Sequence, residues 1–141
     1  MNRILLLLSV SAIALVAGYY LGAAQTAHAQ SRRVFELRTY TTLEGRLDAL
    51  NARFRNHTIK LFEKHGMTNV GYWVPKDAPR SADTLIYILA HKTREAAKES
   101  WDGFRKDPDW IKARDASEAS GKIVAKVESV FLDATDYSKL Q

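Results

Sequence analysis

Residues 33–40, Arg-Val-Phe-Glu-Leu-Arg-Thr-Tyr, decide how this chain folds. Their side chains alternate with a period of two residues, which is the pattern of a β-strand. The alternation gives the strand one largely apolar face and one polar face: Phe35, Leu37 and Thr39 on the first, Glu36, Arg38 and Tyr40 on the second.

An amphipathic helix is predicted after this strand. Residues 41–44, Thr-Thr-Leu-Glu, have the Thr-x-x-Glu spacing of a capping box at a helix start. A mainly apolar stripe then recurs at steps of three and four residues: Leu47, Leu50, Phe54, His57, Thr58, Leu61 and Phe62. Such a stripe marks the buried face of a helix. Gly66 is expected to end it, because glycine is favoured at the C′ position.

Two further strands are predicted next. Residues 68–74 are rich in β-branched and aromatic side chains, as strands are. Residues 75–83 contain two prolines among polar residues and form a loop. Residues 84–90 are apolar on both faces, so we expect this strand to be central in its sheet.

The last third of the chain predicts two helical segments and a strand. Thr93 can cap a helix that runs to about Lys106. Asp107 and Pro108 then fit the N-cap and first position of a second helix, which stops near Gly121. Residues 123–132 form the final strand.

The order β-α-β-β-α-β predicts an α+β fold of the ferredoxin-like, split βαβ type, with a four-stranded antiparallel sheet and helices on one face. The other face of the sheet is expected to carry a mixed but largely apolar set: Glu36, Arg38, Tyr40 and Trp73, with either Ile86 and Ile88 or Tyr87. Because such a face is rarely left in water, we expect a second copy to cover it in a two-fold homodimer.

Residues 1–29 do not belong to this predicted domain. Residues 4–24 are uncharged, and Ala27-His28-Ala29 has the small-x-small pattern of a signal-peptidase site. The same run is also long enough to remain as an uncleaved membrane anchor. Both alternatives place residues 30–141 outside the cytoplasm, so we expect a periplasmic or extracellular protein, or one anchored through residues 4–24 on the extracytoplasmic side.

Composition excludes several classes of function. The chain has no cysteine, which rules out disulfides, thiol nucleophiles and thiolate metal sites. Its net charge of +5 is spread over both signs rather than gathered in a basic patch, so we expect no nucleic-acid partner. The four histidines follow no metal-binding spacing, and no glycine-rich phosphate loop is present. We therefore expect neither metal nor cofactor.

Several motifs, in the same order along the chain, resemble the NIPSNAP family. They cover about 105 residues: Phe-Glu-Leu-Arg-Thr-Tyr at 35–40, Leu-Phe-Glu-Lys-His-Gly at 61–66, Val-Gly-Tyr-Trp at 70–73, Trp-x-x-Phe-Arg-x-Asp-Pro-x-Trp at 101–110 and the tail at 133–138. The tail departs from the family pattern at Ala134 and Lys139, where prolines are expected. The resemblance implies a dimeric α+β barrel, an architecture shared with small monooxygenases, cyclases and isomerases. It implies no particular reaction, and whether the protein is an enzyme stays open.

His57 is the first candidate for chemistry, because it lies on the predicted apolar stripe between Phe54 and Leu61. There an imidazole must find a partner or stay neutral. It is a candidate general base in a cavity between helix and sheet, which for a ligand should hold at least about 300 Å³. The alternative is a hydrogen-bonded histidine of the core or the interface.

Four further residues are candidates for ligand binding. Arg38 and Tyr40 lie two residues apart on one strand face, where they can bind a carboxylate or carbonyl oxygen. Trp73 and Tyr87 add aromatic surface. All four fit a dimer interface or core equally well, because arginine and aromatic residues are enriched at interfaces.

Two functions remain at this point. In the first, an exported dimeric α+β-barrel protein binds a small aromatic or acyl ligand through His57, Arg38 and Tyr40. In the second, the domain is a membrane-tethered interaction or scaffolding module without a ligand.

Overall fold

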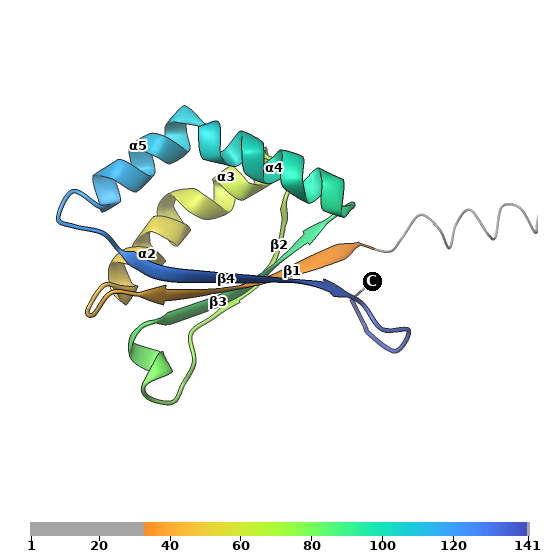
Figure 1. The fold of residues 1–141 in the computed structure, drawn as a ribbon, viewed down its shortest axis with the longest axis horizontal. Coiled ribbons are helices and arrows are strands. Elements are labelled where there is room, and N and C mark those ends of the chain that lie inside the picture. Colours follow the sequence, from red (N-terminus) through yellow and green to blue (C-terminus); the bar gives the residue numbers. More distant parts are fainter. Residues whose placement is uncertain (1–32, 141) are drawn as a thin grey trace, which may run out of the picture. The chain divides into compact units, whose positions relative to one another are not determined.

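Four antiparallel strands form one sheet in the computed structural model, which describes residues 33–140 (Figure 1). The strands are β1 (Val34–Thr42), β2 (Thr68–Trp73), β3 (Thr84–His91) and β4 (Val124–Asp133). Their order across the sheet is β2-β3-β1-β4, with every neighbouring pair antiparallel. This is the predicted ferredoxin-like topology, and β3 is an interior strand as expected.

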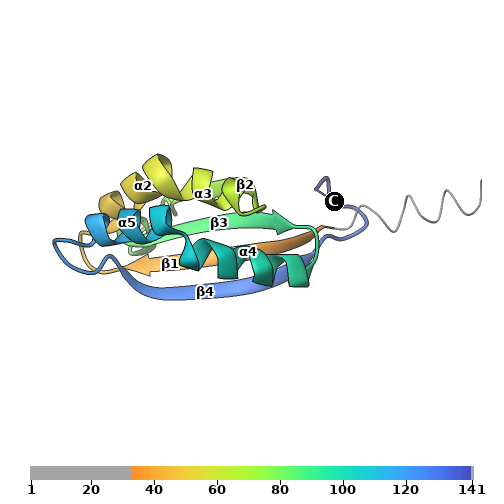
Figure 2. The same cartoon turned by 90° about the horizontal axis from the view of Figure 1, so that it is seen from above.

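The helices form a single layer on one face of this sheet (Figures 1 and 2). They are α2 (Leu47–Arg53), the π-helical turn η1 (Phe54–Thr58), α3 (Ile59–Lys64), α4 (Arg94–Lys106) and α5 (Pro108–Ser117), with a short 3₁₀ turn, η2 (Arg80–Ala82), between β2 and β3. Thr93 caps α4 by accepting the Ala96 N–H at 3.1 Å, and Asp107 caps α5 by accepting the Asp109 N–H at 2.9 Å. Both caps confirm the sequence prediction.

The first helix begins later than predicted. Strand β1 continues to Thr42, and Arg46 occupies the N-cap position without a side-chain capping bond. The capping-box prediction at residues 41–44 is therefore wrong. Thr41 pairs with Thr84 on one side and Lys126 on the other, so its backbone belongs to the sheet ladder. β-Branched residues favour that environment over a helix start.

The π-helical turn changes which side chains of the first helical segment are buried. It inserts extra backbone between α2 and α3, and the Thr58 hydroxyl donates to the Arg53 carbonyl, five residues earlier, at 3.3 Å. Arg53, Phe54 and Thr58 are buried, whereas His57 is exposed. The predicted place of His57 on the buried stripe is thus incorrect, because the stripe assumed an unbroken 3.6-residue period.

An aromatic core lies between the sheet and the helices. Phe54 and Phe62 from the first helical segment, Tyr87 from β3, and Trp101 and Phe104 from α4 are all buried. Their rings contact one another edge-on or tilted, with the Phe62 and Phe104 centroids 4.9 Å apart. Burial of such large rings stabilises the packing of the helices on the sheet.

The prediction for the two faces of β1 is wrong: the face expected to point away from the helices points toward them. Glu36, Arg38 and Tyr40 point toward the helices, since Arg38 contacts Trp101 and Tyr40 contacts Phe54. The uncovered face, called here the open sheet face, carries Phe35, Leu37, Trp73, Ile86, Ile88, Val130 and Leu132. A period of two separates the faces but does not say which one meets the helices.

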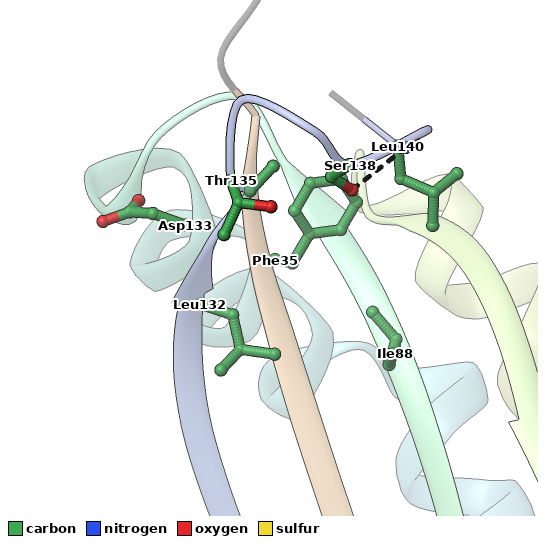
Figure 3. A pocket seen from close by; sticks show the side chains of 8 residues that line it. Phe35, Ile88, Leu132, Asp133, Thr135, Ser138 and Leu140 are labelled. Atoms are coloured by element: carbon green, nitrogen blue, oxygen red, sulfur yellow. Dashed lines mark hydrogen bonds between the residues drawn. The ribbon is translucent and has the colours of Figure 1, made fainter.

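The C-terminal tail folds back over one end of the open sheet face (Figure 3). A pocket of about 270 Å³ lies between tail and sheet, lined by Phe35, Ile88, Leu132 and residues of the tail that include Ser138 and Leu140. The Leu140 N–H donates to the Ser138 hydroxyl at 3.2 Å. This cover leaves Phe35 almost fully buried although it points away from the helices.

Residues 4–24, the predicted signal or anchor segment, lie outside the described residues. Within residues 33–140, none of the helices has the length and apolar character needed to cross a bilayer.

Candidate functional site

A buried carboxylate occupies the centre of the helix-facing side of the sheet. Glu36 on β1 is 1% exposed, and four side-chain donors surround it. They are Arg38 Nη1 at 2.7 Å, Ser129 Oγ at 2.6 Å, Trp101 Nε1 at 2.7 Å and His91 Nε2 at 3.0 Å. These donors come from β1, β4, α4 and β3, so one side chain joins three strands and a helix.

The donors keep Glu36 ionised. Burial alone would raise its pKa, because a charge is less stable away from water. The hydrogen bonds from His91, Ser129, Trp101 and Arg38 outweigh burial and lower the pKa to about 2. At neutral pH the centre therefore holds a negative charge that is fully hydrogen-bonded.

Arg38 is the cation of this centre. Its guanidinium carbon lies 4.2 Å from the centroid of the Trp101 ring, a cation–π contact, and its Nη2 approaches the Tyr40 hydroxyl at 3.5 Å. Burial lowers the pKa of Arg38, but Tyr87, Tyr40 and Glu36 raise it above its ordinary value. The guanidinium is thus a fixed positive charge.

Two buried polar atoms, one on Arg38 and one on the neighbouring Tyr87, have no hydrogen-bond partner among the described residues. Tyr87 Oη and Arg38 Nε are buried and have no hydrogen-bond partner within 3.5 Å among the described residues, although Tyr40 and Arg38 lie near enough to the Tyr87 hydroxyl to influence its pKa. The Tyr40 and Tyr87 rings lie 5.4 Å apart, centroid to centroid. Burial, with Tyr40 adding to it, raises the pKa of Tyr87, so its hydroxyl stays a neutral donor and acceptor.

The row of side chains that contains Arg38 becomes more exposed toward β4. Tyr87, Arg38 and Ser129 are direct neighbours across β3, β1 and β4, and they pass in that order from fully buried to exposed. Val127, which points the same way two residues earlier on β4, is also exposed. The helices therefore leave the β4 end of this row open to solvent.

The structure brings together three of the four predicted ligand-binding residues. Arg38, Tyr40 and Tyr87 meet on the helix-facing side. Trp73 lies apart on the open sheet face, half-exposed, where it pairs with Ile86 at the edge of the sheet.

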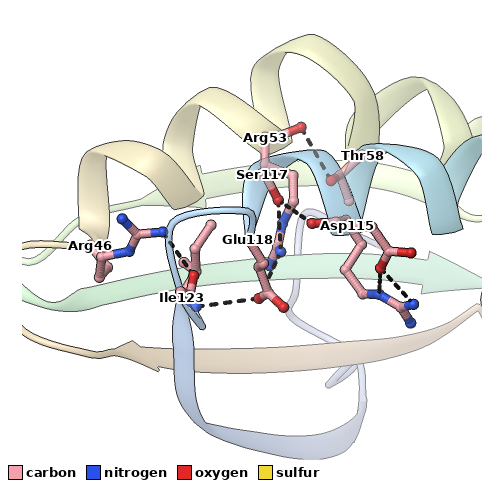
Figure 4. A network of polar contacts seen from close by, with 9 residues as sticks. Arg46, Arg53, Thr58, Asp115, Ser117, Glu118 and Ile123 are labelled. Atoms are coloured by element: carbon pink, nitrogen blue, oxygen red, sulfur yellow. Dashed lines mark hydrogen bonds and ion pairs between the residues drawn. The ribbon is translucent and has the colours of Figure 1, made fainter.

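His57 lies in a separate groove between the first helical segment and α5. The groove holds about 320 Å³ and is walled by four alanines together with Arg53, Asn56 and Ser117. Arg53 closes its floor by donating to Ser117 Oγ at 3.3 Å and Glu118 Oε1 at 3.2 Å (Figure 4). The volume matches the cavity expected beside His57, but the groove opens on the helical layer instead of lying between helix and sheet.

His91 is the residue that sequence reasoning missed. Its Nε2 bonds to Glu36, while its Nδ1 is buried and has no partner within residues 33–140. It lines a pocket of about 490 Å³ at the C-terminal end of α3 and the start of α4. The buried strand 84–91 ends in this histidine, but only the register of β3 against β1 reveals that Glu36 is its partner.

No metal centre is found within the described part of the chain, where no three His, Asp or Glu side chains converge on one point. Asp107 gathers only two side-chain donors, His65 Nε2 at 2.6 Å and Lys64 Nζ at 2.8 Å, and so ties the end of α3 to the start of α5.

Comparison with solved structures supports the fold. A NIPSNAP family protein from Agrobacterium tumefaciens, Atu4242, superposes with a TM-score of 0.66 at 18% identity, covering 77% of this chain and 94% of the other. A NIPSNAP-like domain protein from Burkholderia xenovorans gives 0.65 at 12% identity, over 75% and 88%. A monooxygenase of Streptomyces coelicolor, ActVA-Orf6, solved with the ligand nanaomycin D, gives 0.53 at 10% identity, over 78% and 94%.

Sequence comparison identifies the family. No protein of curated function matches the chain significantly. The family model of NIPSNAP matches residues 35–139, which includes every strand and helix described above except the first residue of β1. With the topology, the sequence motifs and the similar folds in agreement, the chain belongs to the NIPSNAP family.

Proposed function

We propose that this NIPSNAP-family protein binds a small aromatic or acyl ligand through an oxygen atom held at Arg38, Tyr40 and Tyr87. The observation that carries this proposal is the pair of unpartnered atoms, Arg38 Nε and Tyr87 Oη, on neighbouring strands. Leaving a buried polar group unsatisfied costs about 1–3 kcal/mol. A carboxylate or carbonyl oxygen from a ligand would remove that penalty at both atoms.

The surroundings fit such a ligand. Arg38 has a planar guanidinium with donors suited to a carboxylate, and its charge is oriented by Glu36. The rings of Tyr40 and Trp101 flank the guanidinium, so its surroundings are aromatic and suit an aromatic or acyl body. The S. coelicolor monooxygenase, whose fold is similar, is described with a bound organic ligand, so that the architecture can accommodate one.

The proposal includes export and self-association. The segment at residues 4–24 and the Ala-x-Ala site support export. The open sheet face supports a two-fold homodimer, because Trp73, Val130 and Leu132 would otherwise leave apolar surface in water. The His57 groove has its own lining and takes no part in this ligand site.

Removal of the Tyr87 hydroxyl group tests the proposed ligand site. Tyr87→Phe removes the unpartnered Oη and keeps the ring, so the fold should be retained. Titration with benzoate and with hexanoate should show binding to the parent protein and about tenfold weaker binding to the variant. Tyr137→Phe, which changes an exposed tail tyrosine, is the matched control and should leave affinity unchanged.

The opposite result has a clear meaning. Equal affinity in the parent and Tyr87→Phe proteins, or no binding of either acid, would remove the ligand site from the proposal. Retention of the full-length protein on membranes would then favour the alternative, a tethered interaction module held by residues 4–24.

A further inference from the structure

The pocket beneath the C-terminal tail lies on the opposite side of the sheet from the Arg38 site. Side chains alternate along β1, so Phe35 faces away from the helices while Glu36 and Arg38 face them. Phe35 pairs directly with Leu132 of β4, and Ile88 of β3 lies on the same face. Three neighbouring strands therefore supply a floor of one aromatic and two aliphatic side chains, separate from the Glu36 network.

The tail forms a roof over this floor (Figure 3). The Ser138 N–H donates to the Thr135 carbonyl at 3.0 Å, and the Leu140 N–H donates to the Ser138 hydroxyl at 3.2 Å. These two bonds close the tail on itself and bring Leu140 to the pocket. Phe35 is only 8% exposed beneath the tail, whereas Leu140 is 54% exposed. The roof is thus a single layer of chain with its outer side in solvent.

The lining favours a neutral molecule. Among the described residues that line the pocket, Asp133 is the one with an ionisable side chain, and it points away from Phe35 (Figure 3). The register agrees, because Asp133 pairs with Val34, whose side chain lies on the other face of the sheet from Phe35. An ion placed between Phe35, Ile88 and Leu132 would lose its hydration without gaining a charged partner.

The volume of the pocket suits one ring or one short chain. The pocket holds about 270 Å³, whereas an apolar cavity of about 150 Å³ can already bind benzene. A second copy could cover the rest of the open sheet face, but at this end it would meet the tail before the floor. A small molecule is therefore the occupant for which the tail leaves room.

We propose that this pocket binds a neutral, largely apolar small molecule, such as a substituted benzene ring or a short alkyl chain, packed on Phe35, Ile88 and Leu132 and covered by Leu140. Burial of apolar surface supplies the affinity. The site goes beyond the ligand proposed at Arg38, because it lies on the other face of the sheet and takes a molecule without an ionised group.

Methyl NMR of residues 30–141 can test this proposal, since residues 33–140 form one compact unit. Toluene is the neutral probe, and benzylammonium and benzoate present a similar ring with a charge of either sign. With toluene, we expect the methyl resonances of Ile88, Leu132 and Leu140 to shift with a dissociation constant of about 1 mM. The two ions should bind this pocket at least about tenfold more weakly.

Variants of the lining show where the probe binds. Leu132→Phe adds bulk where the ligand would lie and should weaken toluene binding by about tenfold. Leu132 is partly exposed, so the larger side chain should not prevent folding. Val130→Phe is the matched control, because it adds the same ring to the same face of β4 outside the pocket and should leave the affinity unchanged. Leu140→Ala removes the roof side chain and should weaken binding by about fivefold.

The two proposed ligand sites can be told apart, because Tyr87→Phe should leave toluene binding intact. Three results would overturn the inference: unshifted Ile88 and Leu132 methyls in up to about 5 mM toluene, equal affinity in the parent and Leu132→Phe proteins, or equal affinity of toluene and benzoate at these methyls. Shifts that follow the protein concentration instead of the toluene concentration would also overturn it, since a second copy would then occupy the pocket.

Discussion

Trp101 and Arg38 are stacked against each other and donate to the same carboxylate. The guanidinium carbon of Arg38 lies 4.2 Å from the indole centroid, while Trp101 Nε1 and Arg38 Nη1 each bond to Glu36 at 2.7 Å. The contact between ring and cation orients both donors toward one anion. Glu36, Arg38 and Trp101 therefore act as a unit that links β1 to α4.

Replacing the carboxylate should destabilise the fold. Glu36→Gln keeps one acceptor oxygen but presents an NH₂ group to donors, so several buried hydrogen bonds are lost. We expect the free energy of unfolding to fall by about 3 kcal/mol, measured by urea denaturation. Glu128→Gln, which alters an exposed pair with Lys126 on β4, should change it by less than about 1 kcal/mol. Equal effects would show that the Glu36 bonds contribute little.

The same group predicts how stability depends on pH. The folded state lowers the pKa of Glu36 from 4.5 to about 2, so its contribution is complete above pH 4.5. It should be lost as the pH falls from about 4.5 to 2, and the loss should amount to about 3 kcal/mol. Urea denaturation of the parent protein and of Glu36→Gln across this range isolates the term, because other carboxylates titrate in both. Parallel pH profiles would contradict the assignment.

Gly103 should be intolerant of a methyl group for an identifiable reason. A Cβ at this position of α4 would lie 2.9 Å from His65 Nδ1, and that ring is held in place by Asp107. Gly103→Ala should therefore lower the free energy of unfolding by about 1 kcal/mol, although alanine is the better helix former. In a His65→Ala background the same change should instead stabilise by up to about 1 kcal/mol. The same sign in both backgrounds would exclude His65 as the obstacle.

Substitutions at two valines of β4 can test which face of the sheet forms a dimer interface. Val130 and Val127 are both exposed on β4, the first on the open sheet face and the second on the helix-facing side. If two copies join through the open sheet face, sedimentation should show a dimer for the parent protein and for Val127→Asp. Val130→Asp should give monomers, because it would bury an unpaired charge. A Val130→Asp dimer would place the interface elsewhere.

The order of helices and strands can be predicted from short stretches of sequence. The buried site around Glu36 cannot, because its contacts join residues that are far apart in the chain. The starts of α4 and α5 are marked by local signals, namely the N-cap residues Thr93 and Asp107 and the proline at position 108. The order of elements can therefore be predicted from the sequence. The burial of Glu36 depends on donors 55, 65 and 93 residues away, at His91, Trp101 and Ser129. Without the strand register, a charged residue in an alternating strand is assigned to the face away from the helices, which is incorrect here.

His57 shows a second limit. The stripe that included it assumed a regular helix, and the π-helical turn at Phe54–Thr58 moved it out to solvent. The turn is stabilised by a hydrogen bond from Thr58 to Arg53, a contact that no helical periodicity encodes. Among residues 33–140 the buried histidine is instead His91, at the end of β3.

The tail that lies over Phe35 has a practical consequence for work with this protein. Because Leu140 lies against the open sheet face, a tag or fusion partner joined directly after Leu140 would lie close to that surface. Capture on a chip through a C-terminal tag would turn this face toward the support and obstruct whatever binds there. Attachment at the exposed loop near Arg80, between β2 and β3, would leave the tail in its place.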